Sequence, residues 1–183
     1  DAMYLLCFLL WVSVQVTTSV WAVPSSLVSE LGDWTLQTAN ITHLDAGTAP
    51  FYIQQVLRDQ GYIEDVSIGY GETTSRWIAL ADWNATTTLL LNNNIHPTSA
   101  PLPPPSLVYL VFEGIDTIAN IWLNDTTLLG TSRNAHRRHI FLLPPLITTN
   151  NNLSLTVQFL SSSTTAATLA TQHPYLLPYV KHK

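Results

Sequence analysis

Four residues near the middle of the chain have side chains of the types that bind sugars: Arg76, Trp77, Asp82 and Trp83. An indole face stacks on the C–H groups of a sugar ring, and guanidinium and carboxylate groups hydrogen-bond sugar hydroxyls. The alternative is structural: both tryptophans are core anchors and Arg76 pairs with Asp82 to fix a corner of the chain. We favour this alternative, because large aromatic residues on strands are usually packed. The four residues are kept as candidate substrate-binding residues.

Acidic residues could instead perform glycoside hydrolysis. A retaining glycosidase needs two carboxyl groups about 5 Å apart, one as nucleophile and one as acid and base. The glutamates of this chain fall in different expected elements: Glu30, Glu64, Glu72 and Glu113. Glu113 and Asp116 are close in sequence, in a segment typical of a solvated corner at a strand end. We therefore predict no catalytic residue in this chain.

Two polar segments contain residue types that can bind a metal or act as a nucleophile. His136 and His139 flank two arginines, which would repel a cation, and no carboxylate or cysteine stands nearby to complete a metal site. We expect an exposed polar loop there, with no metal and no cofactor. The serines at 161–163 lack the glycines of a nucleophile elbow, so a serine hydrolase is not supported.

Composition excludes some classes of protein. The formal net charge is −5 and only 10% of residues are charged, which argues against a nucleic-acid surface. The only cysteine is Cys7, so the chain after residue 22 has no disulfide and no thiol chemistry. Its stability must come from burial, which a domain of this size can supply.

The first 22 residues have the pattern of a secretory signal peptide. Met3 precedes an apolar run from Tyr4 to Val14, and small residues precede Val23. The run is too short to span a bilayer, so we expect no membrane anchor in the mature chain. We predict secretion, or alternatively delivery to a lysosome or vacuole.

Four Asn-X-Ser/Thr sequons agree with this targeting: Asn40, Asn84, Asn124 and Asn152. Each falls in or next to an expected turn, where solvent could accommodate an oligosaccharide. The alternative is chance, because the chain is rich in asparagine and threonine. We predict N-glycosylation at the four positions.

Short strand-like segments separated by turn signals dominate the rest of the chain. A helix is expected at 53–60, a glycine-containing loop at 67–75 and an exposed proline-rich loop at 92–105. Strands are expected at 32–37, 76–79, 86–91, 107–112, 117–123, 128–130, 139–143 and 153–159. This pattern predicts an all-β, jelly-roll β-sandwich with one short helix. The expected organisation is a signal peptide at 1–22, the sandwich at 23–160 and a connector at 161–183.

The segment 107–130 is the most informative part of the chain. Its first strand is a continuous apolar run of the kind found in doubly buried strands. Its second strand alternates, with Ala119, Ile121 and Leu123 on one face. Asn124 and Asp125 supply a turn before the third strand. We expect the three strands to form an antiparallel β-meander.

With these elements in place, the chain resembles the N-terminal domain of β-mannosidases of glycoside hydrolase family two. The resemblance rests on Leu31–Leu36, Gln55–Asp65, Arg76–Ala79 with Asp82–Trp83, Leu110–Ala119, Trp122–Asn124, Leu129–Gly130, Arg137–Phe141 and Gln172–Tyr175. It implies a galactose-binding-domain-like sandwich that packs on a catalytic barrel. One departure lies at 49–54, where Ala-Pro-Phe-Tyr-Ile-Gln replaces the family's Val-Pro-Gly-x-Val-His motif. Phe51 there cannot adopt every backbone conformation open to glycine, so we expect an altered turn.

The resemblance implies a function only for a longer protein. Such an enzyme would hydrolyse terminal non-reducing β-D-mannose residues with retention, acting on β-mannoside oligosaccharides or N-glycans. Its two catalytic glutamates are expected on a barrel that this sequence does not contain, so whether this chain counts as an enzyme stays open. The alternatives are a free-standing secreted carbohydrate-binding module and a degenerate remnant without activity.

Overall fold

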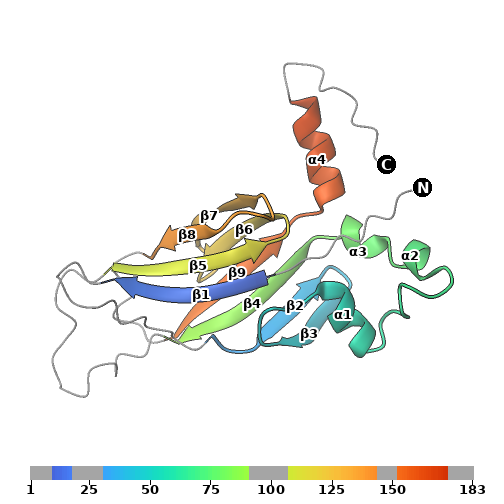
Figure 1. The fold of residues 1–183 in the computed structure, drawn as a ribbon, viewed down its shortest axis with the longest axis horizontal. Helices are drawn as coiled ribbons and strands as arrows, with labels where there is room; N and C mark the ends of the chain where they lie inside the picture. Colours follow the sequence, from blue (N-terminus) through green and yellow to red (C-terminus); the bar gives the residue numbers. More distant parts are fainter. Residues whose placement is uncertain (1–9, 18–30, 91–106, 144–151, 173–183) are drawn as a thin grey trace.

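The computed structural model describes residues 10–17, 31–90, 107–143 and 152–172, which form two antiparallel β-sheets (Figure 1). The six-stranded sheet has the order β3-β2-β4-β9-β6-β7 and the three-stranded sheet the order β1-β5-β8. The strands are β1 (Leu10–Thr17), β2 (Trp34–Thr38), β3 (Ile41–Gly47), β4 (Trp83–Leu90), β5 (Leu107–Ile115), β6 (Ile118–Leu123), β7 (Thr127–Arg133), β8 (His139–Leu142) and β9 (Asn152–Phe159). The helices are α1 (Ile53–Asp59), α2 (Gly71–Thr74), α3 (Trp77–Leu80) and α4 (Ser162–Thr171). The predicted all-β sandwich is confirmed.

The long strands β4 and β9 form the centre of the six-stranded sheet. They pair over their whole length, from Trp83 opposite Phe159 to Leu90 opposite Asn152. Alternate residues of β9 from Leu153 to Phe159 are buried, as the period-two apolar pattern requires of a strand with one face on a core. The neighbouring strand β6 buries Ala119, Ile121 and Leu123, the face expected from sequence.

The expected meander of residues 107–130 is half right. β6 and β7 pair as a hairpin, and its turn contains Asn124 and Asp125 with φ of 50° and 56°. Asparagine and aspartate tolerate this left-handed region better than most residues. However, β5 pairs with β1 and β8 in the other sheet, so the chain crosses between sheets after Ile115. An apolar run indicates a buried strand but not which strand lies beside it.

Several local expectations are also corrected. Residues 76–79, expected as a strand, lie largely in α3, where the buried Ile78 anchors a single helical turn to the core. β3 was not expected from the sequence. The described residues contain four helices, not one, and α4 falls in the range expected as a connector. Ser161 is the N-cap of α4, and its hydroxyl accepts a hydrogen bond from the Thr164 amide.

The range predicted as a signal peptide contains β1. This strand runs antiparallel to β5, from Leu10 opposite Ile115 to Thr17 opposite Leu107. The pairing does not test whether residues 1–22 are removed in a cell, so that stays a prediction. If they are removed, β5 loses one of its two neighbouring strands.

The two sheets approach each other closely at Gly130 of β7 and Phe141 of β8. A Cβ atom added to Gly130 would lie 2.3 Å from Cε1 of Phe141. The Phe141 ring packs edge-on against Phe112, with centroids 5.9 Å apart, and is stacked with His139 at 6.2 Å. Gly130 is therefore needed for the ring to reach the core.

Candidate functional site

The two tryptophans of the predicted sugar-binding set have different environments. Trp83 is completely buried, and its indole Nε1 donates a hydrogen bond to the Ile78 carbonyl at 3.0 Å. Trp77 is partly buried, with its ring centroid 5.9 Å from that of Trp83. Trp83 is thus a core residue, as the structural alternative expects.

Asp82 links three elements. Its Oδ1 accepts a hydrogen bond from the Ser161 amide at 2.7 Å, and its carbonyl accepts one from the Thr38 hydroxyl at 2.7 Å. Among the described residues, the ion pairs are Arg58–Asp59 and Arg138–Glu113, and neither includes Arg76, whose side chain is exposed. Asp82, which follows α3 in the chain, is therefore hydrogen-bonded to β2 and to the start of α4 and does not pair with the expected arginine. Substrate binding by Arg76, Trp77, Asp82 and Trp83 stays a prediction.

Glu113 and Asp116 occupy different environments. Glu113 lies inside β5, not in a turn, and accepts hydrogen bonds from Nε of Arg138 at 2.7 Å and from its Nη2. These bonds lower the pKa of the Glu113 carboxyl. Burial raises the pKa of Asp116, with a smaller opposing effect from His136. The pKa values of the two carboxyl groups are therefore shifted in opposite directions, that of Glu113 downward and that of Asp116 upward.

The segment from His136 to His139 is largely exposed, as expected. Together with β7 it borders an open hollow of about 390 Å³, whose cationic side chains include Arg133 and Arg137. Nε2 of His139 lies 3.1 Å from the Ser132 hydroxyl. In the part of the chain that the structure describes, no three His, Cys, Asp or Glu side chains gather as metal ligands.

Three of the four sequon asparagines have described side chains. Asn40, in the turn between β2 and β3, is exposed. Asn124 is exposed in the β6–β7 turn, and its Oδ1 accepts a hydrogen bond from the Ser154 amide at 2.9 Å. Asn84 lies within β4 and is half-buried, while the side chain of Asn152 lies outside the described residues. Glycosylation at these positions stays a prediction.

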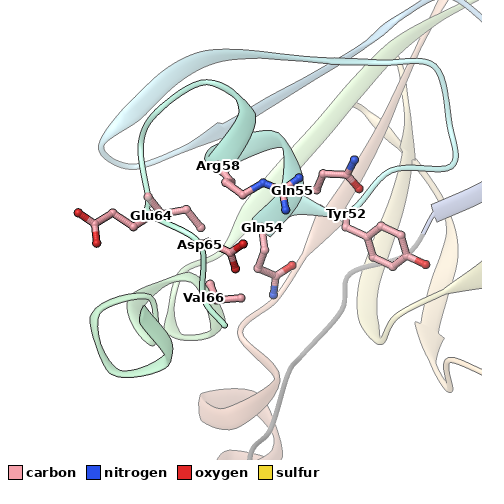
Figure 2. Close-up of a pocket in the computed structure, with 8 residues that line it drawn as sticks. Tyr52, Gln54, Gln55, Arg58, Glu64, Asp65 and Val66 are labelled. Atoms are coloured by element: carbon pink, nitrogen blue, oxygen red, sulfur yellow. The ribbon is translucent and has the colours of Figure 1, made fainter. Parts of the chain in front are cut away.

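The structure adds a site that sequence reasoning missed. A cavity of about 230 Å³ lies between α1 and the segment Ile63–Val66 that follows it (Figure 2). Tyr52, Gln54, Gln55 and Arg58 line it from the helix side. In Figure 2 the side chains of Gln54, Arg58 and Asp65 point toward the same space, whereas Glu64 points away. The sequence contained one signal for this site, because residues 55–65, which include much of its lining, are among the segments that resemble the family.

Asp65 is held in place at the cavity by Ser67. Its Oδ1 accepts hydrogen bonds from the Ser67 amide at 2.9 Å and from the Ser67 hydroxyl at 2.6 Å. These bonds lower the pKa of Asp65, and nearby Arg58 lowers it further, so the carboxyl is ionised at neutral pH. Arg58 itself donates from Nε and Nη2 to Asp59 at 3.1 and 2.9 Å.

Comparison with known protein families shows to which family the chain belongs. Residues 34–183 match the family described as glycosyl hydrolase 2 galactose-binding domain-like. The chain belongs to this family. The resemblance inferred from the sequence motifs is therefore confirmed, and the sandwich is the family's galactose-binding-like fold.

Individual β-mannosidases are similar to this chain in sequence and in fold. A β-mannosidase of Rattus norvegicus is 28% identical over 127 residues, covering 69% of this chain and 14% of the relative. β-Mannosidase A of Aspergillus terreus is 31% identical over 142 residues, covering 71% of this chain and 14% of the relative. The crystal structure of a β-D-mannosidase from Dictyoglomus thermophilum superposes with a TM-score of 0.65 at 23% identity, covering 80% of this chain and 17% of that one. The chain thus spans about one seventh of the length of these relatives.

Proposed function

We propose that this chain is the non-catalytic N-terminal domain of a β-mannosidase. The match of residues 34–183 to the family carries the proposal, since the similar proteins named above are β-mannosidases several times longer. In the complete enzyme, hydrolysis would release terminal non-reducing β-D-mannose residues with retention. Its substrates would be β-mannoside oligosaccharides or N-glycans, and it would have no nucleic-acid partner.

The environments of the described acids support a non-catalytic role. A general acid needs a raised pKa and a partner carboxylate about 5 Å away in a retaining enzyme. Glu113 and Asp65 have lowered pKa values, because each carboxylate accepts hydrogen bonds. Asp116 has a raised pKa, but the charged neighbour that acts on it is His136. The catalytic pair would then come from another part of the longer protein.

A specific observation favours a second function. The cavity beside α1 combines apolar wall atoms with amide, carboxylate and guanidinium groups, which is the composition of a small-molecule site. A secreted carbohydrate-binding module would need such a site and no catalytic residues. A third possibility is a degenerate remnant without activity, and the replacement of the family motif at 49–54 supports it.

The proposal includes targeting to the secretory pathway, with delivery outside the cell, to a lysosome or to a vacuole. It rests on the signal-peptide pattern of residues 1–22 and on the four sequons. Among the described residues, no helix has the length and apolar character that crossing a membrane demands. N-terminal sequencing of the secreted protein should give Val23 as the first residue.

Reading the transcript beyond Lys183 tests the proposed function. We expect an in-frame continuation into a Trp-Asp-Trp-Gly-Pro segment and a barrel, and release of mannose from a β-mannoside by the full-length product. A stop codon directly after Lys183 would overturn the domain proposal. A full-length product without β-mannosidase activity would overturn the proposed substrate.

A further inference from the structure

The cavity beside α1 has the size of a site for one sugar ring. Pockets that enclose drug-sized ligands measure roughly 300–1,000 Å³. At about 230 Å³ this cavity is smaller, so it would admit a monosaccharide unit but not an oligosaccharide lying along its length. A terminal residue of a longer glycan would fit, because the cavity is open to solvent.

The chemistry of the lining matches a neutral polyhydroxyl ring. Sugar hydroxyls both donate and accept hydrogen bonds, and Arg58 can only donate while ionised Asp65 can only accept. Gln55 can do both. Carbon atoms dominate the wall of the cavity and would contact the C–H groups of the ring. An isolated anion is disfavoured, since Arg58, the one cationic side chain of the lining, already pairs with Asp59 and lies near the carboxylate of Asp65.

The polar groups of the cavity are fixed before any ligand arrives. Helix α1 is anchored by three buried side chains, Ile53, Val56 and Leu57. Asp65 is held by Ser67 through Oδ1, and neither of these bonds uses Oδ2. The Gly71 backbone packs tightly against the backbone of Asp65 and Val66, because a Cβ there would lie 2.6 Å from the Asp65 carbonyl oxygen. A preorganised acceptor loses less entropy when it binds a ligand.

The loop after α1 also exposes aromatic and aliphatic side chains. Tyr62 is 53% exposed, Ile68 is 70% exposed and Tyr70 is 85% exposed. Tyrosine combines an apolar face with a hydroxyl, so it suits contact with sugar units that extend beyond a cavity. Exposed side chains of this kind on one loop are typical of a contact surface.

We propose that the cavity formed by α1 and Ile63–Val66 binds a single neutral hexopyranose, such as the terminal mannose of a glycan. Asp65 and Arg58 hydrogen-bond ring hydroxyls, and the wall of the cavity contacts the ring carbons. The inference deepens the proposed function, because it places a sugar site within the domain itself. It does not depend on the catalytic part of a longer enzyme.

The test is a titration of the 183-residue chain with D-mannose, followed by the backbone amide signals in NMR. We expect a dissociation constant on the order of 1 mM, which is usual for a small ligand with few contacts. The signals that move should cluster at residues 52–66. Xylitol, an acyclic polyol without a ring, should bind more weakly.

Two variants and two matched controls assign the site. Asp65→Asn removes an acceptor, and Val66→Phe fills the cavity; each should weaken mannose binding at least tenfold. Asp33→Asn makes the same replacement, and Leu128→Phe a comparable enlargement, at exposed positions remote from the cavity lining and from the loop after α1; both should bind as the parent chain does. Thermal melting of every variant checks that the fold is kept.

Specific results of these experiments would contradict the proposed sugar site. Mannose binding that Val66→Phe leaves unchanged, or that Trp77→Ala alone abolishes, would overturn the site assignment. Absence of signal changes at mannose concentrations far above 1 mM would overturn sugar binding at the cavity. Neither result bears on membership of a β-mannosidase, which the transcript decides, so failure of the site and failure of the proposed function can be told apart.

Discussion

Replacement of Gly130 by alanine tests the account of how the two sheets meet. The added Cβ would lie 2.3 Å from Cε1 and 3.0 Å from Cδ1 of Phe141, well inside contact distance. The ring cannot move away freely, because Phe112 and His139 pack against it. One of these groups must shift, and overpacking of this kind costs about 1–3 kcal/mol.

The expected net effect is smaller than this cost. Alanine is favoured over glycine within a strand by about 0.5–1 kcal/mol, which offsets part of the clash. With the middle of each range, the free energy of unfolding of Gly130→Ala should therefore fall by about 1 kcal/mol. For a chain of this size, that corresponds to a drop in Tm of about 2–4 °C in a calorimetric or circular dichroism melt.

A double mutant and a second glycine provide the controls. Gly32→Ala should be neutral or slightly stabilising, because its Cβ would meet no atom closer than 3.5 Å among those described around it. Phe141→Leu should recover stability in the Gly130→Ala background, with a coupling energy of at least about 0.5 kcal/mol between the two positions. If Gly130→Ala melts at or above the parent temperature, the reasoning about the close approach of the sheets is refuted.

Three further predictions concern stability. Asp82→Ala should lower the free energy of unfolding by about 1–3 kcal/mol in chemical denaturation, because the Ser161 amide at the start of α4 loses its acceptor. Glu113 has a folded-state pKa below its ordinary value near 4.5, so its pairing with Arg138 should stabilise the fold above that pH and stop doing so as the pH falls through the lowered pKa. A Tm profile from neutral to acid pH should therefore be flatter for Glu113→Gln. Removal of residues 1–22 should lower Tm and promote self-association in size-exclusion chromatography, because loss of β1 turns β5 into an edge strand.

Each of these predictions has a contradicting result. Unchanged denaturation of Asp82→Ala together with weakened mannose binding would return Asp82 to a sugar-binding role. Identical acid profiles of the parent chain and Glu113→Gln would mean that the Arg138 pair contributes nothing measurable, as many surface pairs do. Equal Tm values with and without residues 1–22 would show that β1 is not part of the stable sheet.

The sequence by itself determined the class of fold and the kinship. Period-two apolar patterns in β6 and β9 predicted which side chains are buried, because successive residues of a strand point to opposite faces. The helix at 53–60 was predicted from apolar spacing and from Gly61, and α1 ends at Asp59. The motif residues of 107–130 were sufficient to point to the family.

Only the tertiary structure decided which strands pair and where a small molecule could bind. β5 and β6 are consecutive in sequence but lie in different sheets, and local periodicity contains no information about that choice. Tryptophan and aspartate at 82–83 looked suited to sugar contact, yet Trp83 is buried in the core and Asp82 accepts a backbone hydrogen bond. The cavity with Arg58 and Asp65 arises because residues 63–66 fold back beside α1, and the path of this loop depends on packing against the rest of the fold that the local sequence pattern does not specify.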